Sequence, residues 1–485
     1  MIAGSAVRRR AILESGRPNG MIALAGSALA AFWAVVVATV LSPAVLGADE
    51  PPNVLFIAVD DWNDWNSVLE GHPRVHTPNL NRLAARSAVF TRAYCSSPVC
   101  NPSRTAVMFG RPASSTGVYN NEQFMRDSPV LRDADTIPQH FRRHGYRTIT
   151  AGKIFHWYKN EASDPQSWDE QFEYDFWAPR TPRPKYEPFA AGPLDVPDGQ
   201  MPDMKVARWI ADRLAASDDQ PFFMAAGIFR PHLPWRVPQK YFKLYPLNEI
   251  QLPDAKADDW EDLPPRGREI AGWHNPHNES VRLGTWKRGV QAYLASISFA
   301  DACLGVMLDA LEASPHADNT IVILWSDHGY HLGEKLTWHK WKLWEESIRV
   351  NLMCAVPGLT DDGFRINQVV SLLDIYPALN ELAGLPTKPE LEGESFAPLM
   401  RHPDQARDRA VVIHRDYRQY AVRNARFNYI RYEDGSEELY DHRRDPMEWT
   451  NLSKDSVYES VKEDLSKYLP ATNHPPIREA FDSRM

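Results

Sequence analysis

The chain is poor in cysteine and has no excess of positive charge. Four cysteines in 485 residues are too few to form the disulfide framework of a small secreted domain. The formal net charge is −9, so no global positive field attracts nucleic acid, and we expect no nucleic-acid partner. Hydrophobic residues make up 43% of the chain and charged residues 24%, which is typical of a globular protein with a large core.

A targeting segment precedes the globular part of the sequence. Three consecutive arginines stand before an apolar run, residues 21–41, and small residues follow this run. A basic region, an apolar stretch and a small-residue cleavage site are the features of a signal peptide. We therefore expect residues 1–48 to direct export to the periplasm or the medium, with cleavage after Gly47 or Ala48. Because the apolar run is long, residues 21–41 are an alternative membrane anchor.

Short apolar segments alternate with helical patterns along the rest of the chain. Apolar, β-rich segments bounded by turns or polar residues predict buried strands, and helical spacing of Leu80, Leu83, Ala84 and Ser87 predicts a helix between the first two of them. Alternating strands and helices predict a mostly parallel sheet covered by helices on both faces. The expected strands are "VLFIAV", "YRTITAGK", "QPFFMAAGIF" and "NTIVILWS", and the other expected helices are "TIPQHFRRH" and "QAYLASISFADACLGVMLDALEA".

Two regions interrupt this alternation. Residues 158–202 are rich in proline, aspartate and aromatics, and residues 243–285 form a second irregular region. We expect both to be long loops, and loops of this length are usually functional.

The C-terminal part has a different pattern. Residues 401–410 form a charged break, and antiparallel strands with a turn at Asp434 and Gly435 are expected after it. The sequence therefore predicts an α/β catalytic domain over residues 50–400, followed by a smaller α+β subdomain over residues 405–485.

Acidic residues follow two of the expected strands. Asp60 and Asp61 come directly after the first strand, and Asp327 and His328 follow the last. Ligands of open α/β sheets bind beyond the carboxyl ends of the strands. Buried carboxylates that lie together repel one another unless a cation joins them, and three carboxylates favour calcium or magnesium over zinc. The alternative is that these acids cap helices or are solvated, and finding two such groups makes it the weaker reading.

Basic side chains follow the same and other expected strands. Lys153 and His156 come after the second strand, His232 lies in "RPHLPW" after the third, and Lys340 lies in "GEKLTWHKW". Taken singly, such residues are usually structural or lie on the surface. Beside a metal ion, the four together would form a cradle for an oxyanion such as sulfate or phosphate.

The segment "CNPSRTAVMFG", residues 100–110, carries a resemblance to a known family. Cys100 to Arg104 match the signature C-x-P-S-R, and Gly110 matches its trailing glycine. The chain resembles the formylglycine-dependent (type I) sulfatases of the alkaline phosphatase superfamily, and within them the iduronate-2-sulfatase-like branch. The resemblance covers residues 52 to about 452, and it also includes, in the expected order, "FIAVDDWN", "AGKIFH", "RPHLPW", "SDHGYHLGE", "WHK", "LWEESIRV", "LLDIYPALNELAGL" and "LEGESFAPL".

The resemblance implies a fold, a modification and a metal ion. The fold would be alkaline-phosphatase-like, with a large, mixed or mostly parallel sheet flanked by helices and a smaller C-terminal subdomain built on an antiparallel sheet. A sulfatase-maturing enzyme would oxidise Cys100 to Cα-formylglycine, which makes that enzyme a partner of this chain. One calcium ion per chain would be bound by Asp60, Asp61, the group derived from Cys100, Asp327 and His328.

The resemblance also implies roles for the basic residues. Lys153 and Lys340 would bind the sulfate oxygens, and Arg104 would hold the hydrated aldehyde. His156 would act as the base for sulfate release, and His232 would be the general acid for the leaving group. A hydrated aldehyde suits this reaction because one of its two hydroxyls attacks sulfur and the other expels sulfate. An ordinary serine would leave a stable sulfate ester.

These features predict an exported, calcium-dependent sulfuric ester hydrolase that acts on a sulfated carbohydrate, with iduronate-2-sulfatase-like enzymes as the nearest model. One alternative is a phosphomonoester or phosphonate hydrolase of the same superfamily, although no clear ligand set for a second metal is present. The other alternative is a catalytically silent carbohydrate-binding relative. The intact set of Cys100, Arg104 and the basic residues argues against a silent protein.

Overall fold

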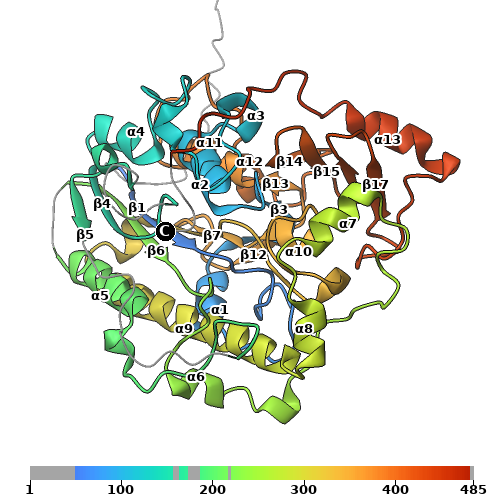
Figure 1. Cartoon of the computed structure of the whole chain (residues 1–485). Helices are drawn as coiled ribbons and strands as arrows, with labels where there is room; N and C mark the ends of the chain where they lie inside the picture. Colours follow the sequence, from blue (N-terminus) through green and yellow to red (C-terminus); the bar gives the residue numbers. More distant parts are fainter. Residues whose placement is uncertain (1–49, 157–162, 173–185, 217–219, 481–485) are drawn as a thin grey trace, which may run out of the picture. The chain divides into compact units, whose positions relative to one another are not determined.

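An eight-stranded sheet forms the centre of the computed structural model, which describes residues 50–156, 163–172, 186–216 and 220–480 (Figure 1). The expected signal segment, residues 1–48 with its apolar run 21–41, lies outside the described residues. In spatial order the strands are β12 (Phe364–Ile366), β2 (Ala88–Phe90), β11 (Leu352–Ala355), β7 (Thr320–Ser326), β1 (Asn53–Val59), β6 (Phe222–Ile228), β4 (Arg147–Gly152) and β5 (Glu170–Phe172).

The sheet is mixed and mostly parallel, which confirms the prediction. β1 pairs in parallel with β6 on one side and with β7 on the other, and β4 pairs in parallel with both β6 and β5. β11 runs antiparallel to both of its neighbours, β7 and β2. The strands β7, β1, β6 and β4 are buried along nearly their whole length, as expected of a sheet covered on both faces.

Helices cover both faces of the sheet, and alternate residues of β1 face two separate cores. Val54 and Phe56 pack into one core, whereas Leu55 and Ile57 pack into the other, because successive side chains of a strand point to opposite faces. The first core includes α2 (Cys100–Phe109), α4 (Ile137–Arg143), α11 (Ile375–Leu382) and α12 (Ala397–Arg401), and the second includes α1 (Pro78–Ala84), α5 (Pro202–Leu214), α6 (Gln239–Lys243) and α9 (Trp286–Glu312) (Figure 1).

The helix α9 is the longest helix of the described residues. It forms over the predicted segment, and the apolar residues along one of its faces, from Tyr293 to Leu311, are buried. By length and composition α9 could cross a membrane, but most of its apolar stretch is buried inside the protein, where it packs against α1, α5 and α6. It is therefore the core helix of one sheet face.

The C-terminal residues form an antiparallel sheet, as predicted. Its strands follow one another in sequence order, and Gly435 takes the positive φ of 83° that the turn between the last two requires. A small core between this sheet and α13 (Glu459–Ser466) includes Tyr429, Leu439 and Leu465. The strands are β14 (Val411–Asp416), β15 (Gln419–Arg423), β16 (Phe427–Arg431) and β17 (Glu437–Asp441).

The first helix is shorter than its apolar spacing predicts. It ends at Ala84, so Ser87 lies outside it and directly precedes β2. The Ser87 hydroxyl donates a hydrogen bond of 2.7 Å to the carbonyl of Leu83. The same carbonyl accepts the N–H of Arg86 at 3.1 Å, and a serine hydroxyl that bonds to a nearby backbone carbonyl competes with continuation of the helix.

The two regions expected to be long loops contain regular elements. Residues 243–285 include α7 (Pro265–Gly272) and α8 (His277–Arg282), and residues 158–202 contribute the edge strand β5. Pro265 stands at the first position of α7, where its fixed φ suits a helix start. Each helix has only a few buried residues, so its apolar pattern is too short to read from the sequence.

Short elements complete the described part of the chain. A three-stranded sheet and a two-stranded sheet join segments around the carboxyl end of the large sheet. The elements are α3 (Ala113–Thr116), α10 (Glu345–Ile348), β3 (Ala93–Tyr94), β8 (His331–Leu332), β9 (Trp338–His339), β10 (Arg349–Val350) and β13 (Val370–Ser371).

Candidate active site

The predicted acidic residues meet at the carboxyl end of the large sheet. Val59 and Ser326, the last residues of β1 and β7, are direct partners in the parallel register. The residues that follow them are therefore neighbours, and the backbone N–H of Asp61 donates to Oδ1 of Asp327 at 3.1 Å. The local sequence thus positions the acids through strand pairing, in agreement with the general rule for such sheets.

The nucleophile candidate Cys100 is the first residue of α2 and is fully buried. Its Sγ lies 3.2 Å from Nε2 of His328 and 3.1 Å from Nζ of Lys340. A cysteine at a helix start thus stands between a metal-ligand candidate and a sulfate-binding candidate. The structure brings these three predicted residues together.

Arg104 lies one turn further along α2 and joins three strand ends. Its Nε donates to Asp327 Oδ2 at 2.8 Å and its Nη2 to Asp60 Oδ1 at 3.3 Å. Its Nη1 donates to the carbonyls of Lys153 at 2.5 Å and Ile154 at 3.0 Å. The guanidinium therefore orients two candidate metal ligands and the backbone that carries a candidate sulfate-binding lysine.

The two lysines each contact one carboxylate of the acidic pair. Nζ of Lys153 lies 2.5 Å from Oδ2 of Asp60, and Nζ of Lys340 lies 2.6 Å from Oδ1 of Asp61. Burial would raise the pKa of Asp60, as would Cys100, but Lys153 and the other nearby cations hold that pKa well below its ordinary value. Asp60 is therefore an anion in the folded protein.

The site stabilises a negative charge at position 100. Burial would raise the pKa of the Cys100 thiol, but Lys153, Lys340 and His328 outweigh it and hold that pKa well below its usual value. Burial would lower the pKa of His328, but the anionic Asp327 and Cys100 raise it to about 9. The surroundings of Cys100 are thus built to hold an anionic atom.

The converging donor atoms fit a divalent cation. One atom from each of Asp60, Cys100, Asp327 and His328 lies within 4.8 Å of the others, and Asp61 belongs to a second, overlapping group. The carbonyl of Gly329 lies 2.9 Å from Nδ1 of His328, so Nδ1 donates to the backbone and Nε2 is the ring atom that points into the group. Burial raises the pKa of Asp327 to about 7 despite Arg104, and a cation would remove that cost of burying a carboxylate. Oxygen donors predominate, which suits a hard ion.

The two predicted histidines differ in their surroundings. Burial lowers the pKa of His156 to about 4, so its imidazole is neutral at neutral pH and can accept a proton. The carbonyl of Leu233 lies 2.5 Å from Nδ1 of His232, which leaves Nε2 facing Asp61 Oδ2 at 3.8 Å. The His232 side chain is 26% exposed, so this residue stands on the open side of the site.

Sequence patterns did not indicate a role for Tyr293. Asp61 has a φ of 61°, a strained conformation for a residue other than glycine. The Tyr293 hydroxyl donates to the carbonyl of Asp61 at 2.7 Å and accepts the N–H of Asn63 at 3.0 Å, which holds this turn. Tyr293 lies on an apolar helix face, and only its hydroxyl group distinguishes it in the sequence from a residue with a purely packing role.

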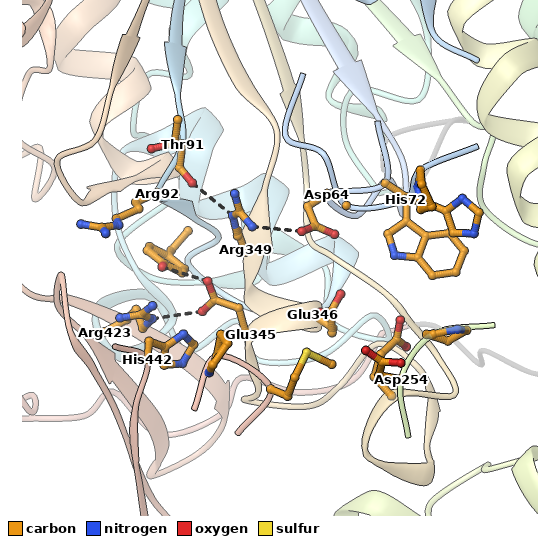
Figure 2. Close-up of a pocket in the computed structure, with 18 of the residues that line it drawn as sticks. Asp64, His72, Thr91, Arg92, Asp254, Glu345, Glu346, Arg349, Arg423 and His442 are labelled. Carbon is orange, nitrogen blue, oxygen red and sulfur yellow. Dashed lines mark hydrogen bonds and ion pairs between the residues drawn. The ribbon is translucent and has the colours of Figure 1, made fainter. Parts of the chain in front are cut away.

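A separate cavity of about 600 Å³ lies beyond the predicted residues, and none of them lines it. Its charged walls are paired in part, because Arg349 binds Asp64 and Arg423 binds Glu345 (Figure 2). Glu345 also belongs to a third group of potential ligands, with His442 and Glu448. Protein donors already satisfy this group, since Glu448 accepts hydrogen bonds from the N–H of Glu345 and from other groups.

The fold and the site define a hydrolase of the alkaline-phosphatase-like type, and comparison with known proteins specifies the family. A family model described as Sulfatase matches residues 52–385, and a model described as N-sulphoglucosamine sulphohydrolase, C-terminal, matches residues 333–474. The first match covers more than half of the chain, so this chain belongs to the sulfatase family. Its class is therefore that of the sulfuric ester hydrolases, and the resemblance seen in the sequence is confirmed.

Curated relatives agree with this assignment. The chain is 39% identical over 443 residues to a sulfatase of Formosa agariphila, with 87% of each chain covered. It is 31% identical over 401 residues to the human iduronate 2-sulfatase, with 71% of each chain covered. It is 29% identical over 437 residues to the choline-sulfatase of Rhizobium meliloti, which covers 83% of this chain and 82% of the relative.

Solved structures share the fold. A 2-O GAG sulfatase superposes with a TM-score of 0.68 at 23% identity, covering 86% of this chain and 90% of the other. A phosphonate monoester hydrolase of Agrobacterium radiobacter superposes with a TM-score of 0.74 at 21% identity, covering 86% and 94%. At these identities the likeness shows the fold, and it confirms the predicted fold class.

Proposed function

We propose that this protein is an exported, formylglycine- and calcium-dependent sulfatase that hydrolyses sulfate esters of carbohydrates. The observation that carries the proposal is the position of Cys100, which lies within hydrogen-bonding distance of both Lys340 and His328 at the edge of the sheet. The Cys-x-Pro-Ser-Arg signature supports the modification. The relationship to an iduronate 2-sulfatase supports a sugar substrate and an iduronate-2-sulfatase-like preference. The apolar run before residue 49 supports export.

Residues of the site would hold the calcium ion and would include the formylglycine. Calcium would be held by Asp60, Asp61, Asp327, His328 and the group at position 100, and when bound it supplies Lewis-acid stabilisation of a sulfate oxygen. Formylglycine, made from Cys100 by a maturing enzyme, supplies a hydrated aldehyde as the nucleophile.

The remaining residues bind sulfate and move protons. Lys153 and Lys340 hold sulfate oxygens through their ammonium groups, which stabilises the negative charge that develops on these oxygens. The neutral imidazole of His156 accepts a proton during sulfate release. His232 donates a proton from Nε2 to the leaving oxygen, since its Nδ1 is engaged by the carbonyl of Leu233. Arg104 holds the hydrated aldehyde, as predicted. Its hydrogen bonds also orient the carboxylates of Asp60 and Asp327.

Mass spectrometry followed by an activity panel tests this proposal. The chain is produced with a formylglycine-generating enzyme, and the tryptic peptide from Ala93 to Arg104 is weighed. We expect a mass matching formylglycine at position 100, and release of sulfate from 4-nitrophenyl sulfate and from sulfated disaccharides. Unmodified cysteine, in a host that converts a control sulfatase, contradicts the proposal.

A phosphonate hydrolase is the second candidate, because such an enzyme shares the fold with a TM-score of 0.74. The same protein is therefore assayed with phenyl phosphonate esters and 4-nitrophenyl phosphate. A kcat/KM for phosphonate above that for every sulfate ester favours this candidate. Binding of sulfated sugars without turnover of any ester favours a silent carbohydrate-binding protein.

A further inference from the structure

The candidate active site opens to solvent on one side. Cys100 and Arg104 are fully buried, whereas the side chains of His232 and Lys340 are 26% and 12% exposed. An ester that places its sulfate beside Cys100 must therefore extend its leaving group past His232 and Lys340. Residues on this side meet the part of the substrate that distinguishes one sulfate ester from another.

Trp341 directly follows Lys340 on this side and is held by two other segments. Its backbone N–H donates to the carbonyl of Pro98 at 3.0 Å, just before Cys100, and its own carbonyl accepts Nε of Arg415 at 2.7 Å. The backbone φ of Trp341 is 72°, which is strained for a bulky residue. Such strain persists only where the surroundings determine it, and it is concentrated at functional sites.

Trp273 stands against Trp341 from a separate loop. The ring centroids are 5.5 Å apart and the planes meet at 63°. Two residues on, the side chain of Asn275 donates to the carbonyl of Leu336 at 2.7 Å, which ties this loop to the segment before Lys340. Trp273 is 45% exposed, so much of a large apolar surface stays in water at a cost in hydrophobic free energy.

Two cationic residues lie near these rings, and one of them, Lys340, is paired with Asp61. Lys340 adjoins Trp341, and the guanidinium carbon of Arg415 lies 6.0 Å from the Trp341 ring. Burial together with the charges of Lys342 and Lys340 lowers the pKa of the neighbouring His339 to about 3. Aromatic rings alone would also bind a quaternary ammonium group, but a cationic surrounding disfavours a cationic leaving group and favours an anionic one.

We propose that Trp273 and Trp341 form a stacking wall for the ring of an anionic pyranose in the leaving group, such as a uronic acid or a second sulfated sugar. This inference rests on the proposed function, because it specifies what the sulfate is attached to. The apolar face of the sugar ring lies against the indole surface, and its anionic substituent lies toward the cationic side of the wall.

Binding to a protein that cannot turn over tests the wall separately from catalysis. The parent is the Cys100→Ala variant, and the probes are a 2-O-sulfated uronate disaccharide, choline O-sulfate and inorganic sulfate, each titrated by calorimetry. We expect Trp273→Ala in this parent to raise the Kd of the disaccharide by about tenfold, the size of a lost aromatic contact. The Kd of inorganic sulfate changes less than twofold, and Trp273→Phe restores most of the affinity for the disaccharide.

Leu244→Ala is the matched control, since Leu244 is also an exposed apolar residue, at 41%. It leaves all three affinities unchanged. The inference is wrong if the parent binds choline O-sulfate more tightly than the disaccharide, or if Trp273→Ala weakens inorganic sulfate and disaccharide equally. If the Cys100→Ala variant binds the disaccharide but the formylglycine enzyme releases no sulfate, the proposed function is wrong and the proposed stacking wall is still supported.

Discussion

Nζ of Lys340 lies 3.1 Å from Sγ of Cys100 and 2.6 Å from Oδ1 of Asp61, so one ammonium joins the nucleophile candidate to a metal-ligand candidate. The two residues stand 240 positions apart in the chain, and the contact is partly buried. A group held in this way stabilises negative charge both on the nucleophile and on an oxyanion bound beside it. This single contact links the proposed modification site with the proposed sulfate site.

Replacing Lys340 tests that link. We expect Lys340→Ala to lower kcat for 4-nitrophenyl sulfate by about 10²- to 10³-fold, the range for loss of one preorganised donor to a developing oxyanion. The measurement is steady-state kinetics with protein of known formylglycine content. Lys287→Ala is the matched control, because Lys287 is exposed and its removal should leave kcat unchanged. A Lys340→Ala enzyme with normal kcat contradicts the assigned role.

Removing calcium should destabilise the protein as well as inactivate it. The candidate ligands are buried acids, and a bound ion at one hundred times its Kd adds about 2.7 kcal/mol to the free energy of unfolding. We expect chelation to lower the thermal midpoint and abolish sulfate release, and added calcium to restore both better than magnesium does.

The third group of potential ligands, around Glu345, provides the control for calcium. Glu345 accepts hydrogen bonds from Arg423 and Tyr94, so it needs no ion. Glu345→Gln should lower the thermal midpoint to the same extent with and without calcium, whereas Asp327→Asn should remove the calcium effect. Retention of the full calcium response by Asp327→Asn rules out the assigned site.

The hydrogen bonds of Arg104 predict that lysine cannot replace it. Its guanidinium contacts Asp327, Asp60 and two carbonyls at once while fully buried. Arg104→Lys keeps the charge, but one ammonium cannot reproduce the several hydrogen bonds of the planar guanidinium. We expect a loss of about 3 kcal/mol in the free energy of unfolding. Urea denaturation measures it.

A surface pair gives the comparison for Arg104. Arg82 binds Asp309 at 2.7 Å, but the two side chains are 37% and 69% exposed. Arg82→Lys should therefore cost less than about 0.5 kcal/mol. Equal costs for the two substitutions would show that burial of the Arg104 network does not set its energy.

The buried His414 should make the free energy of unfolding depend on pH. Burial lowers its pKa from 6.5 to about 4, with a small opposing effect of the Ser96 backbone. Between pH 6.5 and pH 4 the unfolded chain binds a proton at His414 and the folded chain does not, so stability is complete above pH 6.5 and falls as the pH falls. Each pH unit in this window costs about 1.4 kcal/mol, and the total loss is about 3 kcal/mol.

Comparison with a variant isolates this contribution. His414→Phe should unfold with a shallower dependence on pH between 6.5 and 4, measured by urea denaturation at each pH. His402→Phe, at an exposed position, should keep the dependence of the original protein. Parallel curves for the original protein and His414→Phe would show that His414 does not titrate in this way.

Much of the site could be predicted from the sequence because parallel strands end at one edge. Asp60 and Asp327 each follow an apolar run, and the pairing of Val59 with Ser326 then makes them neighbours. The signature around Cys100 indicated the nucleophile candidate without any structure. The prediction that the first helix reaches Ser87 was wrong, because apolar spacing does not reveal a side-chain hydrogen bond at the helix end. The prediction of a long loop at residues 243–285 was also wrong, because short helices with few buried residues have no recognisable apolar spacing.

The sequence by itself determined which groups follow the strands and which cysteine carries the family signature, since both are properties of neighbouring residues. Only the tertiary structure decided how these groups face one another. The approach of Lys340 to Cys100, the support of Asp61 by Tyr293 and the meeting of Trp273 with Trp341 join segments far apart in the chain. The physical reason is that the direction of a side chain is set by the packing of all the elements around it, and no local pattern of residues encodes that packing.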